Sequence, residues 1–166
     1  MLKLEEIIYE YHKEHKILIF SSFVKALERV KEILIGLNIK YYVLTGETKP
    51  LDRKRLVDEF NNDPSIKVFL ISLKAGGTGL NLIGADTVIH LDPWWNLSAE
   101  NQASDRAHRI GQTKTVEVIK LVAFDSLEER VIELQNIKKD IIDKVIAKDD
   151  SKITNFSIDD LKYILG

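Results

Sequence analysis

The sequence predicts an α/β domain with three layers, in which a mainly parallel sheet is flanked by helices. Short apolar runs of strand length alternate along the chain with amphipathic stretches of helical period. Alternation of this kind is typical of parallel crossover units, whose sheets are covered on both faces. The chain has 166 residues, of which 45% are hydrophobic and 30% charged. This is the composition of a soluble globular protein.

The individual elements follow from these patterns. The apolar runs that we expect to form strands are residues 16–20, 39–44, 66–71, 87–91 and 115–122. Helical spacing is found at 2–11, 24–34, 50–61, 126–147 and 157–165, and in a stretch that begins near Ser98. We expect one α/β unit over residues 1–125 and a helical C-terminal extension over 126–166.

Several helix ends carry recognisable capping residues. Ser21 or Ser22 can cap the second helix, and Gly36 can end it. Ser98 can cap the helix that follows the fourth strand. Residues 126–129 read Ser-Leu-Glu-Glu, which is a capping box that opens the long helix of the extension.

Composition excludes several classes of protein. The net charge of −2 argues against a passive nucleic-acid coat, because such proteins are strongly basic, but it allows a local basic track. The chain has no cysteine and its 4 histidines are scattered, so we expect no disulfide and no metal site. No apolar run has membrane-spanning length, and residues 1–6 do not resemble a signal peptide. We therefore expect no membrane partner and no secretion.

The loops that follow the predicted strands are the candidate ligand-binding segments, because open parallel sheets bind ligands at the carboxyl ends of their strands. These loops are rich in Gly, Ser, Thr, Trp and Asn, and they cover residues 21–22, 45–49, 72–79 and 92–96.

One of these loops, at 72–81, reads SLKAGGTGLN and has three glycines within four positions. Such a loop lets the backbone approach a ligand and point N–H groups at an anion. Gly79 and Gly84 have the glycine spacing of a P-loop. The segment is nevertheless not a Walker A motif, because Gly84 is followed by Ala85 and Asp86 rather than by Lys and Ser or Thr. No Walker B pair follows a buried strand either. The sequence therefore indicates a domain that touches a nucleotide without holding its Mg²⁺ and phosphates alone.

Three polar residues further along, Gln102, Arg106 and Arg109, are spaced by four and three positions. On an α-helix this spacing would place their side chains on one face. Two guanidiniums and an amide in a row suit the oxygens of a phosphate chain. The alternative is an ordinary solvated helix face.

Five blocks in order carry a family resemblance: ILIFSSF (17–23), LTGET (44–48), SLKAGGTGLN (72–81), DPWWN (92–96) and QASDRAHRIGQ (102–112). Together they resemble the C-terminal RecA-like lobe of the Swi/Snf family of helicase-like, DNA-translocating ATPases. The absence of a large insertion between the blocks favours a minimal translocase of the recombination-associated Rad type over a nucleosome remodeller. One departure is Leu97, since the family usually has proline after the Trp-Asn pair. The resemblance implies a RecA-like fold of the P-loop NTPase type.

The resemblance also implies a nucleotide site shared between two lobes. ATP and Mg²⁺ would be held mainly by an N-terminal RecA-like lobe of the same protein. Arg106 and Arg109 match the motif whose arginines reach the ATP phosphates, and Gln102 begins the same motif. Gly79 and Asn81 match the block that borders the nucleotide.

The second implied ligand is double-stranded DNA. The matching residues are Ser22, Thr45, Gly46, Ser72, Lys74, Trp94 and Asn96. Most would contact phosphate or sugar, which gives binding without sequence preference. The tryptophan loop has an alternative interpretation as a hydrophobic plug, and Arg53 and Lys54 are expected to be solvated charges. A recombination or chromatin protein is a further expected partner, and the expected location is the cytoplasm or the DNA of a nucleoid or nucleus.

Two other functions remain open at this point. The lobe could be a non-enzymatic DNA-binding or protein-binding adaptor, or it could belong to a helicase that separates strands. The Trp-Trp-Asn loop and the Arg-Ile-Gly-Gln ending speak against the latter.

Overall fold

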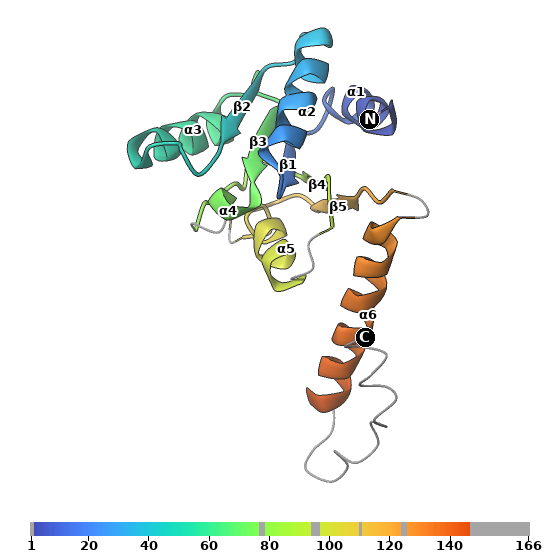
Figure 1. Cartoon of the computed structure of the whole chain (residues 1–166). Helices are drawn as coiled ribbons and strands as arrows, with labels where there is room; N and C mark the ends of the chain where they lie inside the picture. The colour runs from blue at the N-terminus through green and yellow to red at the C-terminus, as the bar shows by residue number, and fades with distance from the viewer. Residues whose placement is uncertain (1, 77–78, 94–96, 110, 124–125, 147–166) are drawn as a thin grey trace. The chain divides into compact units, whose positions relative to one another are not determined.

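A computed structural model describes residues 2–76, 79–93, 97–109, 111–123 and 126–146. The strands are Ile17–Ser21 (β1), Tyr41–Leu44 (β2), Val68–Ser72 (β3), Thr87–His90 (β4) and Glu117–Lys120 (β5). The helices are Leu2–Tyr11 (α1), Val24–Gly36 (α2), Pro50–Asn62 (α3), Leu73–Gly76 (α4), Leu97–Ser104 (α5) and Leu127–Ile146 (α6) (Figure 1). The chain divides into two compact units, Met1–Val122 and Ala123–Gly166.

The strands form one sheet in the order β2-β3-β1-β4-β5, and every described pair is parallel. The predicted α/β class and parallel sheet are therefore confirmed. The chain leaves β1 for the β2 edge, returns through β3, and crosses β1 to reach β4 and β5. Strand β1 consequently lies at the centre, with Ile17 opposite both Val68 of β3 and Thr87 of β4.

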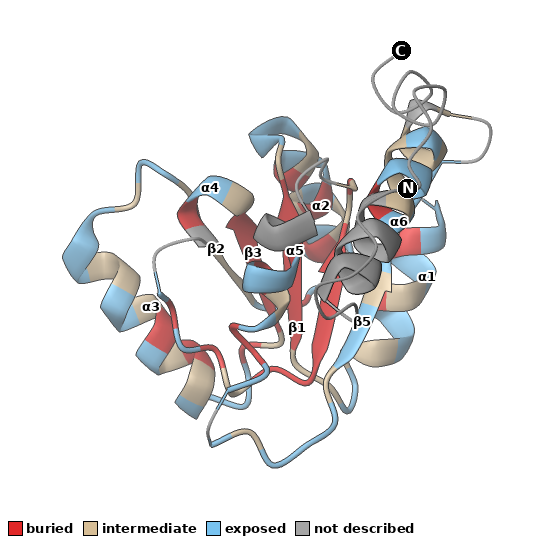
Figure 2. Cartoon of the chain, turned by 90° about the horizontal axis from the view of Figure 1, so that it is seen from below, coloured by how far each residue is buried: buried red, intermediate tan, exposed pale blue. Residues whose placement is uncertain are grey.

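Alternate residues of the strands belong to two separate cores, one on each face of the sheet. Figure 2 shows that the strands at the centre of the sheet are buried. On one face, Leu18 and Phe20 of β1 belong to a cluster with Phe60 of α3, Ala75 of α4 and Ala103 of α5. On the other, alternate residues of the same strand belong to a second cluster that includes residues of α1 and α2. Its core members are Leu4, Ile8, Ile17, Ile19, Leu27, Val30, Leu34, Ile39, Val68, Leu70 and Ile89. Two-sided burial explains why β1 and β3 read as nearly continuous apolar runs.

The ends of α2 differ in detail from the expectation. The residue at the N-cap is Phe23, without a side-chain hydrogen bond, so neither Ser21 nor Ser22 caps this helix. Gly36 is the last helical residue as predicted, but the left-handed residue is Asn38, with φ 55°. Asn38 N donates to Ile35 O and Ile39 N donates to Leu34 O, which is the Schellman arrangement that satisfies the last carbonyls.

Ser126 caps the start of α6, as predicted. Its Oγ accepts a hydrogen bond from Glu128 N at 3.1 Å. The carboxylate of Glu128 accepts a further hydrogen bond from Ala123 N at 2.7 Å. The predicted short helix at 157–165 lies outside the described residues.

A buried histidine lies beneath α5. His90 of β4 is 1% exposed, stacks on Phe20 with ring centroids 5.6 Å apart, and has Nε2 at 3.0 Å from Ser104 Oγ. Burial lowers the pKa of His90, and Lys120 lowers it further, while Glu100 and Asp92 act in the opposite direction. The folded chain therefore favours neutral His90 at a pH where an unfolded histidine is protonated.

We predict that this histidine makes stability depend on pH. Between the ordinary histidine pKa of about 6.5 and the lower folded value, the unfolded chain binds the extra proton. Stability is therefore complete above about pH 6.5 and falls below it, with a limiting slope of about 1.4 kcal/mol per pH unit for one group. Urea unfolding at several pH values measures this slope.

The variant that tests this is His90→Gln, which removes the titration. The slope between pH 5.5 and 7 should be smaller in His90→Gln than in the wild type. An equal slope in wild type and His90→Gln contradicts the assignment.

Candidate functional site

The carboxyl ends of the parallel strands collect most of the predicted DNA-binding residues at one edge of the sheet. Ser22 follows β1, Thr45 and Gly46 follow β2, and Ser72 ends β3. The register places Ser21 opposite Ser72 and Leu44 opposite Ile71, so these loops are neighbours. Lys74 lies in α4, directly after β3. The predicted residues Trp94 and Asn96 lie outside the described residues.

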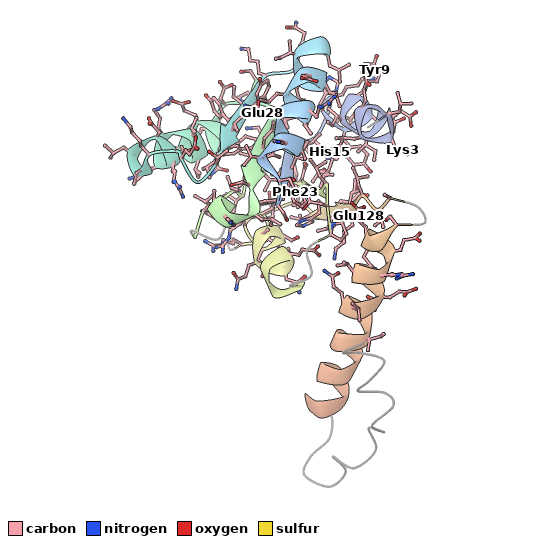
Figure 3. The ribbon with its side chains drawn as sticks, in the orientation of Figure 1. Lys3, Tyr9, His15, Phe23, Glu28 and Glu128 are labelled. Carbon is pink, nitrogen blue, oxygen red and sulfur yellow. The ribbon has the colours of Figure 1, made fainter. Side chains whose placement is uncertain are left out.

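These residues differ in accessibility. Gly46 and Lys74 are exposed and Thr45 is half-buried, so a backbone amide, a hydroxyl and an ammonium group are available. Ser72 is only 5% exposed. Ser22 is half-buried, and its buried Oγ has no hydrogen-bond partner among the described residues. Phe23, labelled in Figure 3, adds an aromatic ring that is 64% exposed at the start of α2.

Arg53 shapes the loop after β2 and is not the solvated charge that the sequence suggested. Its Nε donates to Thr48 O at 2.8 Å, and its Nη2 donates to Gly46 O at 3.1 Å. The loop also closes on itself, since Thr45 N donates to Thr48 Oγ1 at 3.1 Å. Because Arg53 donates hydrogen bonds to two carbonyls of the loop, the Thr-Gly loop has a defined shape.

Asp92 connects the loops after β1 and β4, a role that sequence reasoning missed. Its carboxylate accepts from Ser22 N at 2.9 Å and from the hydroxyl of Ser21, and the residue is 8% exposed. The available signal was its position, because an acidic residue just after a buried strand lies at the same edge as the other loops. Asp92 thereby fixes the backbone that carries Ser22.

The predicted helix face of Gln102, Arg106 and Arg109 is wrong. Helix α5 ends at Ser104, so Gln102 is helical and exposed while both arginines lie in the turns that follow. The cause is a tertiary hydrogen bond: Arg106 O accepts from Leu82 N at 2.9 Å, and a continuing helix would need that carbonyl for itself.

The structure nevertheless brings the two arginines to the glycine loop. Arg109 Nη1 donates to Gly79 O at 3.3 Å, and Gly79 has φ +70°, which favours glycine. Asn81 is exposed, and its carbonyl accepts from Asn61 Nδ2 at 2.8 Å. Four of the five predicted nucleotide-binding residues therefore belong to two adjacent segments, and Gln102 lies one turn before them on α5.

The electrostatics of the arginine pair favour an anion. Arg106 is 7% exposed, and its buried Nε has no hydrogen-bond partner among the described residues. Burial lowers the pKa of Arg106, Arg109 lowers it further, and Asp105 opposes both effects. A buried guanidinium beside a second one is stabilised by a negative group that accepts their hydrogen bonds.

Within the described ranges, no three His, Asp or Glu residues are grouped so that they could hold a metal ion. None of the helices described is both long enough and apolar enough to cross a membrane.

Comparison with known proteins gives consistent matches. The helicase conserved C-terminal domain matches residues 1–111. An uncharacterized ATP-dependent helicase of Mycoplasma pneumoniae is 42% identical over 145 residues, which are 87% of this chain and 14% of that protein. The chromatin-remodeling ATPase INO80 of Cryptococcus neoformans is 43% identical over 133 residues, which are 80% of this chain and 8% of that protein. The chain thus spans a small part of the length of these relatives.

One solved structure is similar to this chain in both fold and sequence. The C-terminal part of the Fun30 ATPase domain superposes with a TM-score of 0.76 at 40% identity, over 79% of this chain and 43% of that one. The parallel sheet is accordingly RecA-like. The chain belongs to the helicase conserved C-terminal domain family, and its relatives are ATP-dependent helicases of the Swi/Snf type.

Proposed function

We propose that this chain is the C-terminal half of an ATP-dependent translocase of double-stranded DNA. The observation that carries the proposal is the pair formed by buried Arg106, whose Nε has no hydrogen-bond partner among the described residues, and exposed Arg109, whose Nη1 donates to Gly79 O of the glycine loop. The chain has no Walker A motif. The pair therefore suits a nucleotide held by another lobe.

In this proposal, ATP and Mg²⁺ are held mainly by an N-terminal RecA-like lobe of the same protein. Arg106 and Arg109 stabilise the charge that develops on the transferring phosphoryl group. Arginines in this role contribute about 10³ to 10⁵ in rate in other nucleotide hydrolases. Gly79 and Asn81 border the nucleotide, and Gln102 helps to orient the arginine segment.

The carboxyl edge of the sheet supplies part of the DNA track. Lys74, Thr45 and the Gly46 amide are accessible there, and groups of these types bind phosphate without reading sequence. Ser22, whose Oγ is buried and has no hydrogen-bond partner among the described residues, and Ser72, Trp94 and Asn96 complete the proposed set. Small hydroxyls and amides contact DNA without making the chain basic, which agrees with a net charge of −2.

The relatives bear on the substrate in general terms. Their names include chromatin-remodeling ATPases and ATP-dependent helicases, so DNA is the substrate class we favour. Movement along duplex DNA predicts ATP-driven displacement of a bound third strand. A strand-separating helicase would instead release one strand of the duplex itself.

We predict that Arg106→Ala and Arg109→Ala each lower kcat for DNA-stimulated ATP hydrolysis by about 10³-fold or more in the full-length protein. The loss arises because charge on the phosphoryl group is no longer neutralised. DNA affinity, measured separately without hydrolysis, should change little.

Arg29→Ala is the matched control, because Arg29 is an exposed arginine of α2. Its turnover should equal that of the wild type. Normal turnover in Arg109→Ala would refute the assignment of the pair, and the chain expressed alone should hydrolyse no ATP.

A second prediction concerns the DNA track. Lys74→Ala should weaken DNA binding about equally for all sequences and reduce the slope of log affinity against log salt by about one. Fluorescence anisotropy with two unrelated duplexes at several salt concentrations measures both effects. Lys13→Ala alters an exposed lysine in the turn that enters β1, at the opposite edge of the sheet, and should leave both unchanged. A sequence-dependent loss at Lys74 would contradict a phosphate contact.

A further inference from the structure

Two side-chain amides fasten the segment that follows the glycine loop. The first belongs to Gln112, which is half-buried. Its Nε2 donates to Ala85 O at 2.7 Å, to Ile83 O at 3.1 Å and to Ala107 O at 3.3 Å. Its Oε1 accepts from Lys114 N at 2.9 Å. One side chain thus joins residues 83–85 to the segment that contains the arginines.

The second amide is that of Asn61, at the end of α3. Asn61 Nδ2 donates to Asn81 O at 2.8 Å, and Asn61 Oδ1 accepts from Gly84 N at 2.9 Å. The approach is close, because a Cβ built on Gly84 would lie 2.9 Å from Asn61 Cα. Only glycine allows this contact without a shift of backbone. Residues 81–84 are therefore held from the α3 side, as Gln112 holds residues 83–85 from the other.

The segment held in this way contacts both arginines. Leu82 N donates to Arg106 O at 2.9 Å, and Gly79 O accepts from Arg109 Nη1 at 3.3 Å. Gln112 N also donates to Arg109 O at 2.9 Å. This turn passes through Gly111, whose φ is +106°. The carbonyl of Arg106, and the carbonyl and guanidinium of Arg109, are thereby all hydrogen-bonded to residues 79–82 or to Gln112.

These hydrogen bonds matter because the two arginines do not belong to a helix that would fix their relative positions. Helix α5 ends at Ser104, so their spacing does not follow from helical geometry. Groups that stabilise a transition state must be held closely, and a displacement of about 1 Å can cost about 10²-fold in rate. Amides that bind several carbonyls at once restrict such displacement better than apolar contacts do.

We propose that Gln112 and Asn61 are positioning residues that set the geometry of the Arg106–Arg109 pair. The inference rests on the function proposed above. Neither side chain touches the nucleotide in this scheme. Each acts through residues 79–85, which carry the hydrogen bonds to the arginines.

The test uses the full-length protein and compares Gln112→Ala, Asn61→Asp and Arg109→Ala singly, together with the double variant Gln112→Ala/Arg109→Ala. Asn61→Asp keeps an acceptor for Gly84 N, replaces the donor to Asn81 O by a carboxylate oxygen and adds a negative charge. It serves where Gln112→Ala impairs folding. Asn62→Ala is the matched control, because the Asn62 amide donates to Asp58 O within its own helix. Thermal unfolding of each variant accompanies the kinetics.

We expect Gln112→Ala and Asn61→Asp to lower kcat for DNA-stimulated ATP hydrolysis by about 10- to 100-fold. The KM for ATP and the affinity for DNA should stay within about twofold. In the Arg109→Ala background, Gln112→Ala should change kcat by less than about twofold, because residues that act through one another are not additive. Asn62→Ala should match the wild type.

Each contrary outcome has a distinct meaning. Full turnover in Arg109→Ala overturns the proposed function itself. Loss of turnover in Arg109→Ala, with normal turnover in folded Gln112→Ala and Asn61→Asp, overturns the positioning role alone. An equal fold-loss from Gln112→Ala in both backgrounds also overturns it, because a purely structural defect would be independent of Arg109.

Discussion

The pairing of β1 with β3 on one side and β4 on the other is the constraint on which the rest of the α/β unit depends. It places β1 at the centre of the sheet, where helices cover both faces, so that Leu18 and Phe20 enter one core and Ile17 and Ile19 enter the other. The β2–β3 and β4–β5 pairs are parallel as well, so all five strands of this sheet run in one direction. The loops after β1, β2, β3 and β4 therefore meet at one edge, where polar side chains from distant parts of the sequence become neighbours.

Neighbouring loops need fixed shapes before they can bind a ligand together. Asp92 ties the loop after β1 to that after β4 through Ser22 N and the Ser21 hydroxyl. Arg53 closes the loop after β2 from the first turns of α3. In both cases a charged side chain is used to satisfy groups of the protein itself. The groups left accessible are isolated ones, such as the ammonium of Lys74 and the backbone at Gly46.

The arginine segment obeys a different constraint, which is competition for backbone carbonyls. A helix that continued past Ser104 would use Arg106 O within itself, but that carbonyl accepts from Leu82 N. The chain turns instead, and Ala107 enters the core that also contains Phe60 of α3 and Ala103 of α5. Arg106 is carried into a buried position with an unpaired Nε, while Arg109 stays exposed. This asymmetry gives the two guanidiniums different environments although they belong to one motif.

Much of the fold was determined by the sequence alone. Apolar runs such as 16–20 and 66–71 could be buried on both faces only as central strands, and the stretches between the runs had the period of helices that cover a sheet. The order of the blocks from ILIFSSF to QASDRAHRIGQ was sufficient to indicate the family, because each is a local run of residues. Helix boundaries at α1 and α3 were predicted closely, since their apolar spacing and Pro50 are local signals.

Only the tertiary structure decided how the candidate site is built. Spacings of four and three at Gln102, Arg106 and Arg109 predicted one helix face, because sequence periodicity cannot register a hydrogen bond from Leu82, more than twenty positions away. The contacts of Asp92, Asn61 and Gln112 were missed for the same reason, since each binds backbone groups that carry no side-chain signature. Local propensity therefore determined the elements of this protein. Long-range hydrogen bonds to the backbone decided where its charged groups lie.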